Sequence, residues 1–291
     1  MPQQYKPISL DMQEEYLKRF ALCPQKASDY SFANLWGWAE EYGLEYLFGN
    51  QCVWIRQTIP ETVYWAPVGP WHDVDWDACP IICNTDRYIR VPSQLAEIWK
   101  NKLAERCKLV ESRGHWDYLY SVAELTELRG NRFHKKKNHL NQFKKQYDWE
   151  YRPMDADCVE EALELQDEWC QWRECEDSPA LIAENQAVLR TLTNWDRIPG
   201  LLGGSLYVDG HMVAYTVAEP LTKDTVVIHF EKGKPGFRGV YQAMNQMFLQ
   251  DQGPRFVLVN REQDLDDEGL RKAKLSYHPT GFLEKYEVHV A

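Results

Sequence analysis

The sequence predicts an α+β protein with mostly antiparallel strands, and three observations lead to this fold class. Several stretches carry apolar residues at helical spacing behind a capping residue. Other stretches are short, rich in β-branched and aromatic residues, and bounded by glycine turns. The order of helices, antiparallel strands, helix and strand occurs twice along the 291 residues. Because this length suits two domains of ordinary size, we expect a tandem arrangement of residues 1–128 and 129–291.

The first half contains clear start and turn signals. Ser9 or Asp11 is a suitable cap for a helix with Tyr16 and Phe20 on one side. The pair Gly49-Asn50 is typical of a hairpin turn between two strands. We expect helices at 9–23 and 29–43, two strands within 44–58, a strand at 62–69, a helix at 91–107, and strands at 107–112 and 117–122.

The second half follows the same order, and Asp209-Gly210 gives it a strong hairpin signal. We expect a helix at 131–147, a strand at 149–154, helices at 158–172 and 178–195, a hairpin at 203–221, a strand at 225–233, a helix at 240–251, a strand at 255–262, a helix at 264–277 and a strand at 284–290.

Composition excludes several classes of protein. Hydrophobic residues make up 44% of the chain, which is enough to bury full cores. The first residues are polar, and no stretch reaches the roughly 18 apolar residues of a membrane span, so we expect a cytoplasmic protein without an integral membrane segment. The eight cysteines lack zinc-site spacing, so we expect free, mostly buried thiols and no metal. An acidic net charge of −11 disfavours general coating of nucleic acid.

One strip of the acidic chain is strongly basic. Residues 131–147 hold six Lys or Arg, two His and no acidic residue, although the rest of the chain carries −17. On a helix, four of these side chains share one face, since they fall at i, i+3, i+4 and i+7. They are Arg132, Lys135, Lys136 and His139. The pattern favours a surface for phosphate or nucleic acid, and the alternative is a solvated helix face.

A glycine-rich turn follows the strand at 225–233. Gly233, Gly236 and Gly239 stand between this strand and a helix, together with three cations, Lys232, Lys234 and Arg238. Glycines let backbone N–H groups approach an anion, and a helix N-terminus attracts negative charge. The turn therefore favours phosphate binding, and the alternative is a sharp strand-to-helix connection.

Polar side chains near two strand ends are candidates for acid–base chemistry. His229 and Glu231 alternate along one strand and point to one face, as either an acid/base pair or a buried hydrogen-bonded pair. Tyr277 is either a proton donor or a packed aromatic residue. A second strand ends in three polar residues that we expect to face a cleft, namely Asn260, Arg261 and Glu262.

These motifs resemble a known family. The stretches DYSFANLWGW, LRGNRFHKKKNHLNQFKKQY, HFEKG and NREQDLDDEGLRKAKLSYHP are similar to the phosphatidylglycerol lysyltransferase C-terminal domain family, over nearly the whole chain. The resemblance implies two tandem GNAT-like (acyl-CoA N-acyltransferase) domains, with mixed, mostly antiparallel sheets flanked by helices, related to Fem-type aminoacyl transferases. The segment GKPGFRG departs from the Q/R-x-x-G-x-G/A loop that usually holds coenzyme A in GNAT proteins.

The implied activity is acyl or aminoacyl transfer from acyl-CoA or aminoacyl-tRNA to an amine or hydroxyl. The resemblance implies no tightly bound cofactor, with tRNA as a partner and a small molecule, peptide or lipid headgroup as acceptor. In this interpretation the turn and Lys232 hold the donor phosphate. Glu231 or His229 removes the acceptor proton, Asn260 orients the carbonyl or the acceptor, and Tyr277 serves the leaving group. The alternative is a non-catalytic module on a GNAT scaffold that binds nucleic acid or another anionic ligand.

Overall fold

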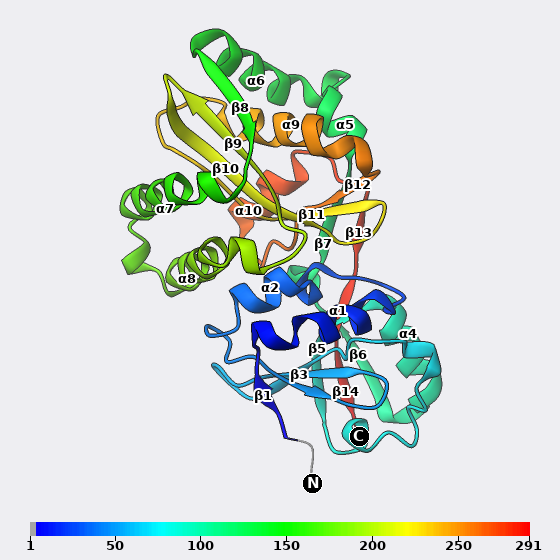
Figure 1. The fold of residues 1–291 in the computed structure, drawn as a ribbon. Coiled ribbons are helices and arrows are strands. Elements are labelled where there is room, and N and C mark those ends of the chain that lie inside the picture. Colours follow the sequence, from blue (N-terminus) through cyan, green and yellow to red (C-terminus); the bar gives the residue numbers. More distant parts are fainter. Residues whose placement is uncertain (1–3) are drawn as a thin grey trace. The chain divides into compact units, whose positions relative to one another are not determined.

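The computed structural model describes residues 4–291, which form two compact units (Figure 1). The first unit extends to Asp117 and also includes Gln263–Asp267 and Phe282–Ala291. The second unit consists of Tyr118–Glu262 and Glu268–Gly281. These units differ from the division at residue 128 that we expect from the sequence, since the last strand groups with the first unit. The division into two GNAT-like domains at that residue stays a prediction.

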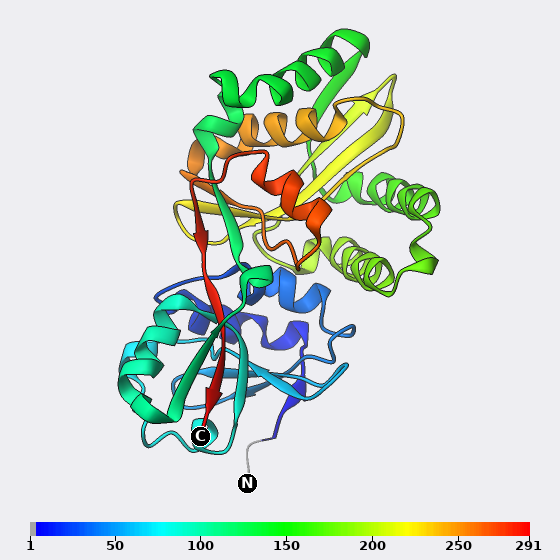
Figure 2. The ribbon, with the colours of Figure 1, turned by 180° about the vertical axis from the view of Figure 1, so that it is seen from behind.

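The first unit is built on a seven-stranded sheet. Its strand order is β1 (Lys6–Pro7), β2 (Glu45–Phe48), β3 (Val53–Gln57), β4 (Val63–Trp65), β5 (Arg87–Pro92), β14 (Lys285–Val290) and β6 (Cys107–Glu111). Its helices are α1 (Gln13–Ala21), α2 (Phe32–Gly37), α3 (Pro80–Cys83) and α4 (Ser93–Leu103). Strand β14 pairs antiparallel with both β5 and β6, and Figure 2 shows it in red beside these strands. The last strand thereby completes a sheet that begins at residue 6.

Charged groups are buried beside β14. The Lys285 ammonium bonds to Asp29 and lies 2.6 Å from an Asp117 carboxylate oxygen, and all three side chains are fully buried. Arg90 also bonds to Asp29, at 2.5 Å. Two carboxylates and two cations therefore balance one another, which buried charges require.

The second sheet has the order β13 (Gly281–Leu283), β7 (Asp117–Ser121), β12 (Leu258–Asn260), β11 (Thr225–Gly233), β10 (His211–Pro220), β9 (Leu202–Val208) and β8 (Trp149–Pro153). Only β11–β12 is parallel among the second unit's strand pairings for which the structure gives a register. The helices are α5 (Val122–Glu127), α6 (His134–Gln146), α7 (Val159–Arg173), α8 (Pro179–Thr193), α9 (Val240–Gln252) and α10 (Glu268–Leu275). The α+β class with mostly antiparallel sheets flanked by helices is confirmed.

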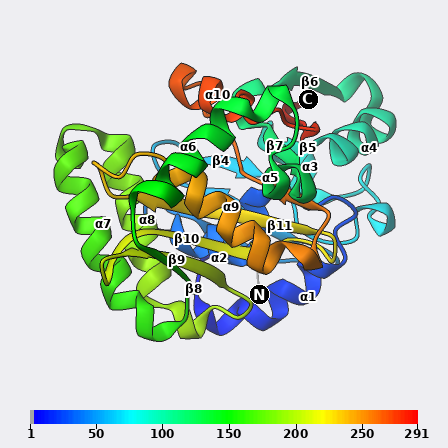
Figure 3. The ribbon, with the colours of Figure 1, turned by 90° about the horizontal axis from the view of Figure 1, so that it is seen from above.

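Helices cover both faces of the second sheet. Glu231 and Lys232 are neighbours on β11 and must point to opposite faces. Glu231 bonds to α9 and Lys232 to α8, so these two helices lie on opposite faces. The basic helix α6 packs on α9, as the view in Figure 3 shows. The face with α9 and α6 is where most of the predicted site residues lie.

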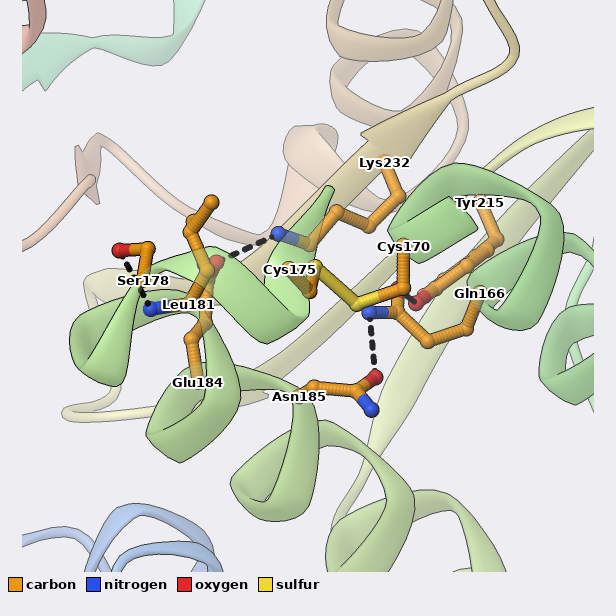
Figure 4. The surroundings of a disulfide bond; sticks show 9 residues. All are labelled: Gln166, Cys170, Cys175, Ser178, Leu181, Glu184, Asn185, Tyr215 and Lys232. Carbon is orange, nitrogen blue, oxygen red and sulfur yellow. Dashed lines mark hydrogen bonds and ion pairs between the residues drawn. A yellow bond between two sulfur atoms is a disulfide. The ribbon is translucent and has the colours of Figure 1, made fainter. Parts of the chain in front are cut away.

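The cysteines differ from the expectation of free thiols. Cys170 and Cys175 form a disulfide with a Cα–Cα distance of 5.1 Å (Figure 4). Cys170 is in the last turn of α7, and Glu174 then takes a left-handed conformation (φ 52°) that turns the chain back. This reversal brings the two sulfurs together, and spacing alone does not reveal it. The other six cysteines are free, as predicted, but only Cys23 and Cys52 among them are buried, so the expectation of mostly buried thiols is wrong.

Candidate functional site

Strand β11 places a buried carboxylate at the centre of the candidate site. Glu231 Oε1 accepts a hydrogen bond from Arg261 Nη2 at 3.1 Å, and Oε2 accepts one from Asn245 Nδ2 at 3.4 Å. Burial raises the pKa of Glu231, although the Arg261 cation and the Asn245 amide oppose the rise. A carboxylate with a raised pKa is a stronger base than an exposed one, so Glu231 is suited to take a proton.

Tyr277 lies beside this ion pair, in contact with two cations. The Arg261 guanidinium is 5.0 Å from the centre of the tyrosine ring, and the Lys136 ammonium is 3.8 Å from it. Gln242 Nε2 donates to the phenolic oxygen at 3.3 Å. Burial raises the pKa of Tyr277, so the phenol keeps its proton at neutral pH. Four predicted residues therefore meet here, namely Lys136, Glu231, Arg261 and Tyr277.

Lys136 is half-buried, as is Lys144 on the same helix, whereas Lys135, Lys137 and Lys145 are exposed. Burial and, secondarily, the Arg261 charge lower the pKa of Lys136 to about 8. Lys274 Nζ donates to the backbone oxygen of Arg261 and thereby fixes the end of β12. The site is thus lined by several cations around one carboxylate, an arrangement that stabilises negative charge on a bound group.

His229 does not have the free nitrogen that a base needs. Its Nε2 lies 2.9 Å from Glu219 and its Nδ1 lies 2.8 Å from Glu262. Burial alone lowers the pKa of His229, but the hydrogen bonds to the two carboxylates outweigh it and raise this pKa to about 10. Both nitrogens therefore carry protons at neutral pH and donate them to the carboxylates. His229 is thus buried and hydrogen-bonded, but to Glu219 and Glu262, whereas Glu231 bonds to Arg261 and Asn245. His229 and Glu231 therefore do not form the hydrogen-bonded pair that their spacing suggests.

Asn260 is fully buried at the end of β12. Its Oδ1 accepts a hydrogen bond from the backbone nitrogen of Glu262 at 2.8 Å. Glu262 has a left-handed conformation with φ 55°, so this bond supports an unusual turn. The role of Asn260 in orienting a carbonyl stays a prediction.

The glycine turn packs directly against the basic helix. Gly236 and Gly239 have φ of 92° and 87°, which favours glycine at both positions. A side chain at Gly239 would lie 2.3 Å from the backbone oxygen of His139 in α6. The Tyr147 hydroxyl donates to Gly236 O and accepts from Arg238 N, both at 3.3 Å. Gly236 and Arg238 remain exposed, so the turn offers backbone and a cation to solvent.

Lys232 lies on the other face of the sheet. Its ammonium is 2.8 Å from Glu184 of α8 and 3.8 Å from the centre of the Trp169 ring. The side chain is only 5% exposed, so the structure does not bring this cation to the exposed edge of the turn. Gly233 also packs inward, since a side chain there would lie 2.8 Å from Val240.

The four cations of the predicted helix face have separate surroundings. Arg132 pairs with Glu124, and Lys136 joins Tyr277. His139 is half-buried, with its backbone against Gly239. Lys135 is exposed, as are Lys137 and Lys145 elsewhere on the helix. The exposed lysines are the part of the strip that is open to a large anion.

Sequence reasoning missed Gln242, Asn245 and Glu219. A signal existed for Asn245, which is a polar amide within the buried length of α9, whereas Gln242 is only half-buried. Buried amides need hydrogen-bond partners, and such partners are often functional groups. Glu219 has no comparable signal, since its position beside His229 depends on the sheet.

Residues 4–291 contain no helix that is both long and apolar enough to cross a bilayer. In the same range, no group of three or more His, Cys, Asp or Glu residues has an arrangement that could hold a metal ion.

Comparison with solved structures shows a shared fold. A Bacteroides thetaiotaomicron protein of unknown function is 30% identical, with a TM-score of 0.88 over 99% of this chain and 100% of that one. The C-terminal domain of a putative lysylphosphatidylglycerol synthetase from Agrobacterium fabrum is 13% identical, with a TM-score of 0.67 over 97% and 92%. FemX is 9% identical, with a TM-score of 0.59 over 99% and 97%. The fold is tandem GNAT-like.

Sequence comparison gives the family. An uncharacterized protein of Mycoplasmoides gallisepticum is 26% identical over 175 residues, which is 60% of this chain and 56% of that protein. The chain thus spans little more than half the length of this curated relative. Residues 20–289 match the family described as "Phosphatidylglycerol lysyltransferase, C-terminal". The chain therefore belongs to the phosphatidylglycerol lysyltransferase C-terminal family, as its motifs predict.

Proposed function

We propose that this chain is an acyltransferase or aminoacyltransferase that moves an acyl or aminoacyl group from a phosphate-containing donor to an amine or hydroxyl. The observation that carries the proposal is the buried Glu231 carboxylate, paired with Arg261 beside Tyr277. We infer that Glu231 acts as the base, Arg261 as the stabilising cation and Tyr277 as the proton donor, three roles that acyl transfer uses. Family membership and the tandem GNAT-like fold support the same reaction class.

The donor is aminoacyl-tRNA or acyl-CoA, bound as a substrate and not as a tight cofactor. The turn between Gly233 and Gly239 presents backbone and the Arg238 cation to solvent, and it packs against α6, the helix that carries exposed lysines. Exposed cations and the N-terminus of a helix suit phosphate groups. In this proposal Lys232 has no direct contact with phosphate, because it is buried against Glu184.

The acceptor is a small molecule, a peptide or a lipid headgroup, and the reaction takes place in the cytoplasm, where both donors are available. Glu231 takes the proton of the acceptor as its nitrogen or oxygen attacks the acyl carbon. The bond from that carbon to the donor oxygen or sulfur then breaks, and Tyr277 protonates the leaving atom. Arg261 and Lys136 stabilise the negative charge that develops, and no covalent enzyme intermediate forms.

The test compares two charge-neutralising variants of the second unit. Glu231→Gln keeps the shape of the side chain and removes the base. Glu164→Gln is the matched control, since Glu164 is exposed on α7. Purified protein is incubated with a pool of radiolabelled aminoacyl-tRNAs or with radiolabelled acetyl-CoA, together with a mixture of amines, peptides and lipid headgroups.

The wild type and Glu164→Gln are expected to transfer label from one donor at equal rates. Glu231→Gln is expected to lose roughly 10²- to 10⁴-fold in rate while binding the donor normally. Binding of a donor by the wild type with no transfer to any acceptor would contradict the proposal and favour the non-catalytic binding module.

A further inference from the structure

The disulfide of the second unit belongs to a chain of contacts that leads to the glycine turn. Cys170 and Cys175 pack in a small apolar cluster with Trp169 and the partly buried Leu181. Trp169 Nε1 donates to the Tyr241 hydroxyl at 3.2 Å, and that hydroxyl donates to Gly233 O at 3.3 Å. One aromatic pair thus connects the disulfide cluster to the first residue of the turn.

A second set of contacts connects the same helices to the residues around the turn. Glu168 of α7 pairs with Lys234, and Glu184 of α8 lies 2.8 Å from Lys232 (Figure 4). The Lys232 ammonium also lies 3.8 Å from the centre of the Trp169 ring. Lys232 and Lys234 are therefore held by α8 and α7, the two helices on either side of the turn that the disulfide closes.

The disulfide closes the link between α7 and α8 around a residue in a disfavoured conformation. Glu174 has φ 52°, a conformation that non-glycine residues disfavour, and it lies inside the loop that the disulfide closes. Backbone hydrogen bonds also hold this link, from Glu174 N to the carbonyl oxygens of Cys170 and Gln171, from Asp177 N to Glu174 O and from Ser178 N to Cys175 O. Loss of the covalent link leaves Glu174 held by these backbone hydrogen bonds.

A reductant has a route to the buried sulfurs. The residues around them are exposed, and they are Gln171, Trp172, Arg173, Glu174, Glu176 and Asp177. Opening of one short turn at the surface exposes the disulfide without unfolding the sheet, because local unfolding needs much less free energy than global unfolding.

We propose that Cys170 and Cys175 form a reversible thiol–disulfide exchange site, whose state controls how firmly the glycine turn is held. A thiolate of a dithiol reductant attacks one sulfur and forms a mixed disulfide, and its second thiolate releases the protein. Two electrons and two protons pass to Cys170 and Cys175, and the reductant becomes a cyclic disulfide. The consequence for donor binding rests on the proposed function, whereas the exchange and the change in the turn do not.

The experiment uses full-length protein, oxidised in air or reduced with dithiothreitol, and includes no donor. Alkylation under denaturing conditions counts free thiols, and hydrogen–deuterium exchange follows the amides of residues 171–178 and 233–241. Six alkylated cysteines are expected when oxidised and eight when reduced. Reduction is expected to speed exchange roughly 30-fold at 171–178, the size that the loop-closure entropy of a disulfide loop of about five residues gives. Residues 233–241 are expected to exchange roughly threefold faster or more, with no change in α4.

Two variants distinguish the opening of the disulfide loop from its effect on the glycine turn. Cys170→Ser with Cys175→Ser is expected to show the fast exchange of the reduced protein with or without dithiothreitol. Trp169→Phe keeps an aromatic ring near Lys232 but removes the donor to Tyr241. It is expected to retain the redox effect at 171–178 and lose most of it at 233–241.

Eight free thiols in the oxidised protein overturn the proposal, as does unchanged exchange at 233–241 after reduction. A protein that passes these tests but binds neither aminoacyl-tRNA nor acetyl-CoA overturns the proposed function and leaves the exchange site standing.

Discussion

The Lys136 ammonium lies 3.8 Å from the centre of the Tyr277 ring, with the Arg261 guanidinium over the same ring. A cation over an aromatic face is worth about 0.5–2 kcal/mol and favours the phenolate that Tyr277 becomes after it gives up its proton. Lys136→Met is therefore expected to lower the transfer rate about tenfold. Lys136→Arg keeps a cation and is expected to retain most of the activity.

The dependence of the transfer rate on pH also tests the role of Lys136. Because the pKa of Lys136 is about 8, the wild-type rate is expected to fall above that pH as the ammonium loses its proton. Arginine does not titrate in this range, so Lys136→Arg is expected to move the fall to higher pH. Rate measurements from pH 6 to 10 test this, and identical alkaline limbs in the two proteins would show that Lys136 only fills space.

His229 makes the folded state sensitive to pH. Its pKa is about 10 in the folded protein and about 6.5 in an unfolded chain, so the folded state binds the proton more tightly. The resulting stabilisation is complete below about pH 6.5 and is lost as the pH rises through about 10. Wild-type Tm is expected to fall between pH 6 and 9 more steeply than that of His229→Gln. Equal slopes in calorimetry would mean that His229 is neutral between Glu219 and Glu262.

Gly236 and Gly239 both have a left-handed backbone, but only Gly239 is crowded by a neighbouring atom. Gly236→Ala meets no atom within 4 Å, and its left-handed backbone costs roughly 1–2 kcal/mol. Gly239→Ala has the same backbone cost and also places a methyl group against His139 O, which adds roughly 1–3 kcal/mol. A lower urea midpoint is expected for Gly239→Ala than for Gly236→Ala. Equal midpoints would indicate that α6 moves away from the turn without loss.

The exposed lysines of α6 are expected to contact phosphates. Lys135→Glu with Lys137→Glu should weaken tRNA binding and reduce the slope of log Kd against log salt concentration by roughly 2. Lys100→Glu with Lys102→Glu makes the same charge change on exposed positions of α4. This control is expected to change the slope less. If both double variants behave alike, binding responds to net charge and the basic helix has no special role.

The sequence predicts the basic helix well because one periodicity decides it. Phe133, Leu140, Phe143 and Tyr147 fall at helical spacing and predict a buried apolar stripe; the first three are buried in the structure, and Tyr147 is half-buried. The contact of Lys136 with Tyr277 cannot be predicted from the periodicity of the helix. It requires two segments more than 130 residues apart in sequence to meet, and no local pattern specifies their approach.

Lys232 and His229 show what the pattern of a strand decides and what it leaves open. The alternation of side chains on a strand implies that Lys232 faces away from Glu231, and the structure places these two side chains on opposite faces. The protonation of His229 depends on the two carboxylates that bond to its ring nitrogens. Glu219 lies on β10 and Glu262 follows β12, so their position depends on strand pairing that the sequence does not show.

Strand β14 affects how the chain folds during synthesis. Asp29 and Asp117 are made early, but Lys285, which lies between them in the finished first unit, is made more than 160 residues later. Until then Arg90 balances one of the two carboxylates, and the second charge cannot be buried without a large penalty. Most of the second unit leaves the ribosome before this strand does. The unit that contains the N-terminal residues is therefore the last to complete its core, the reverse of the order in which domains usually fold on the ribosome.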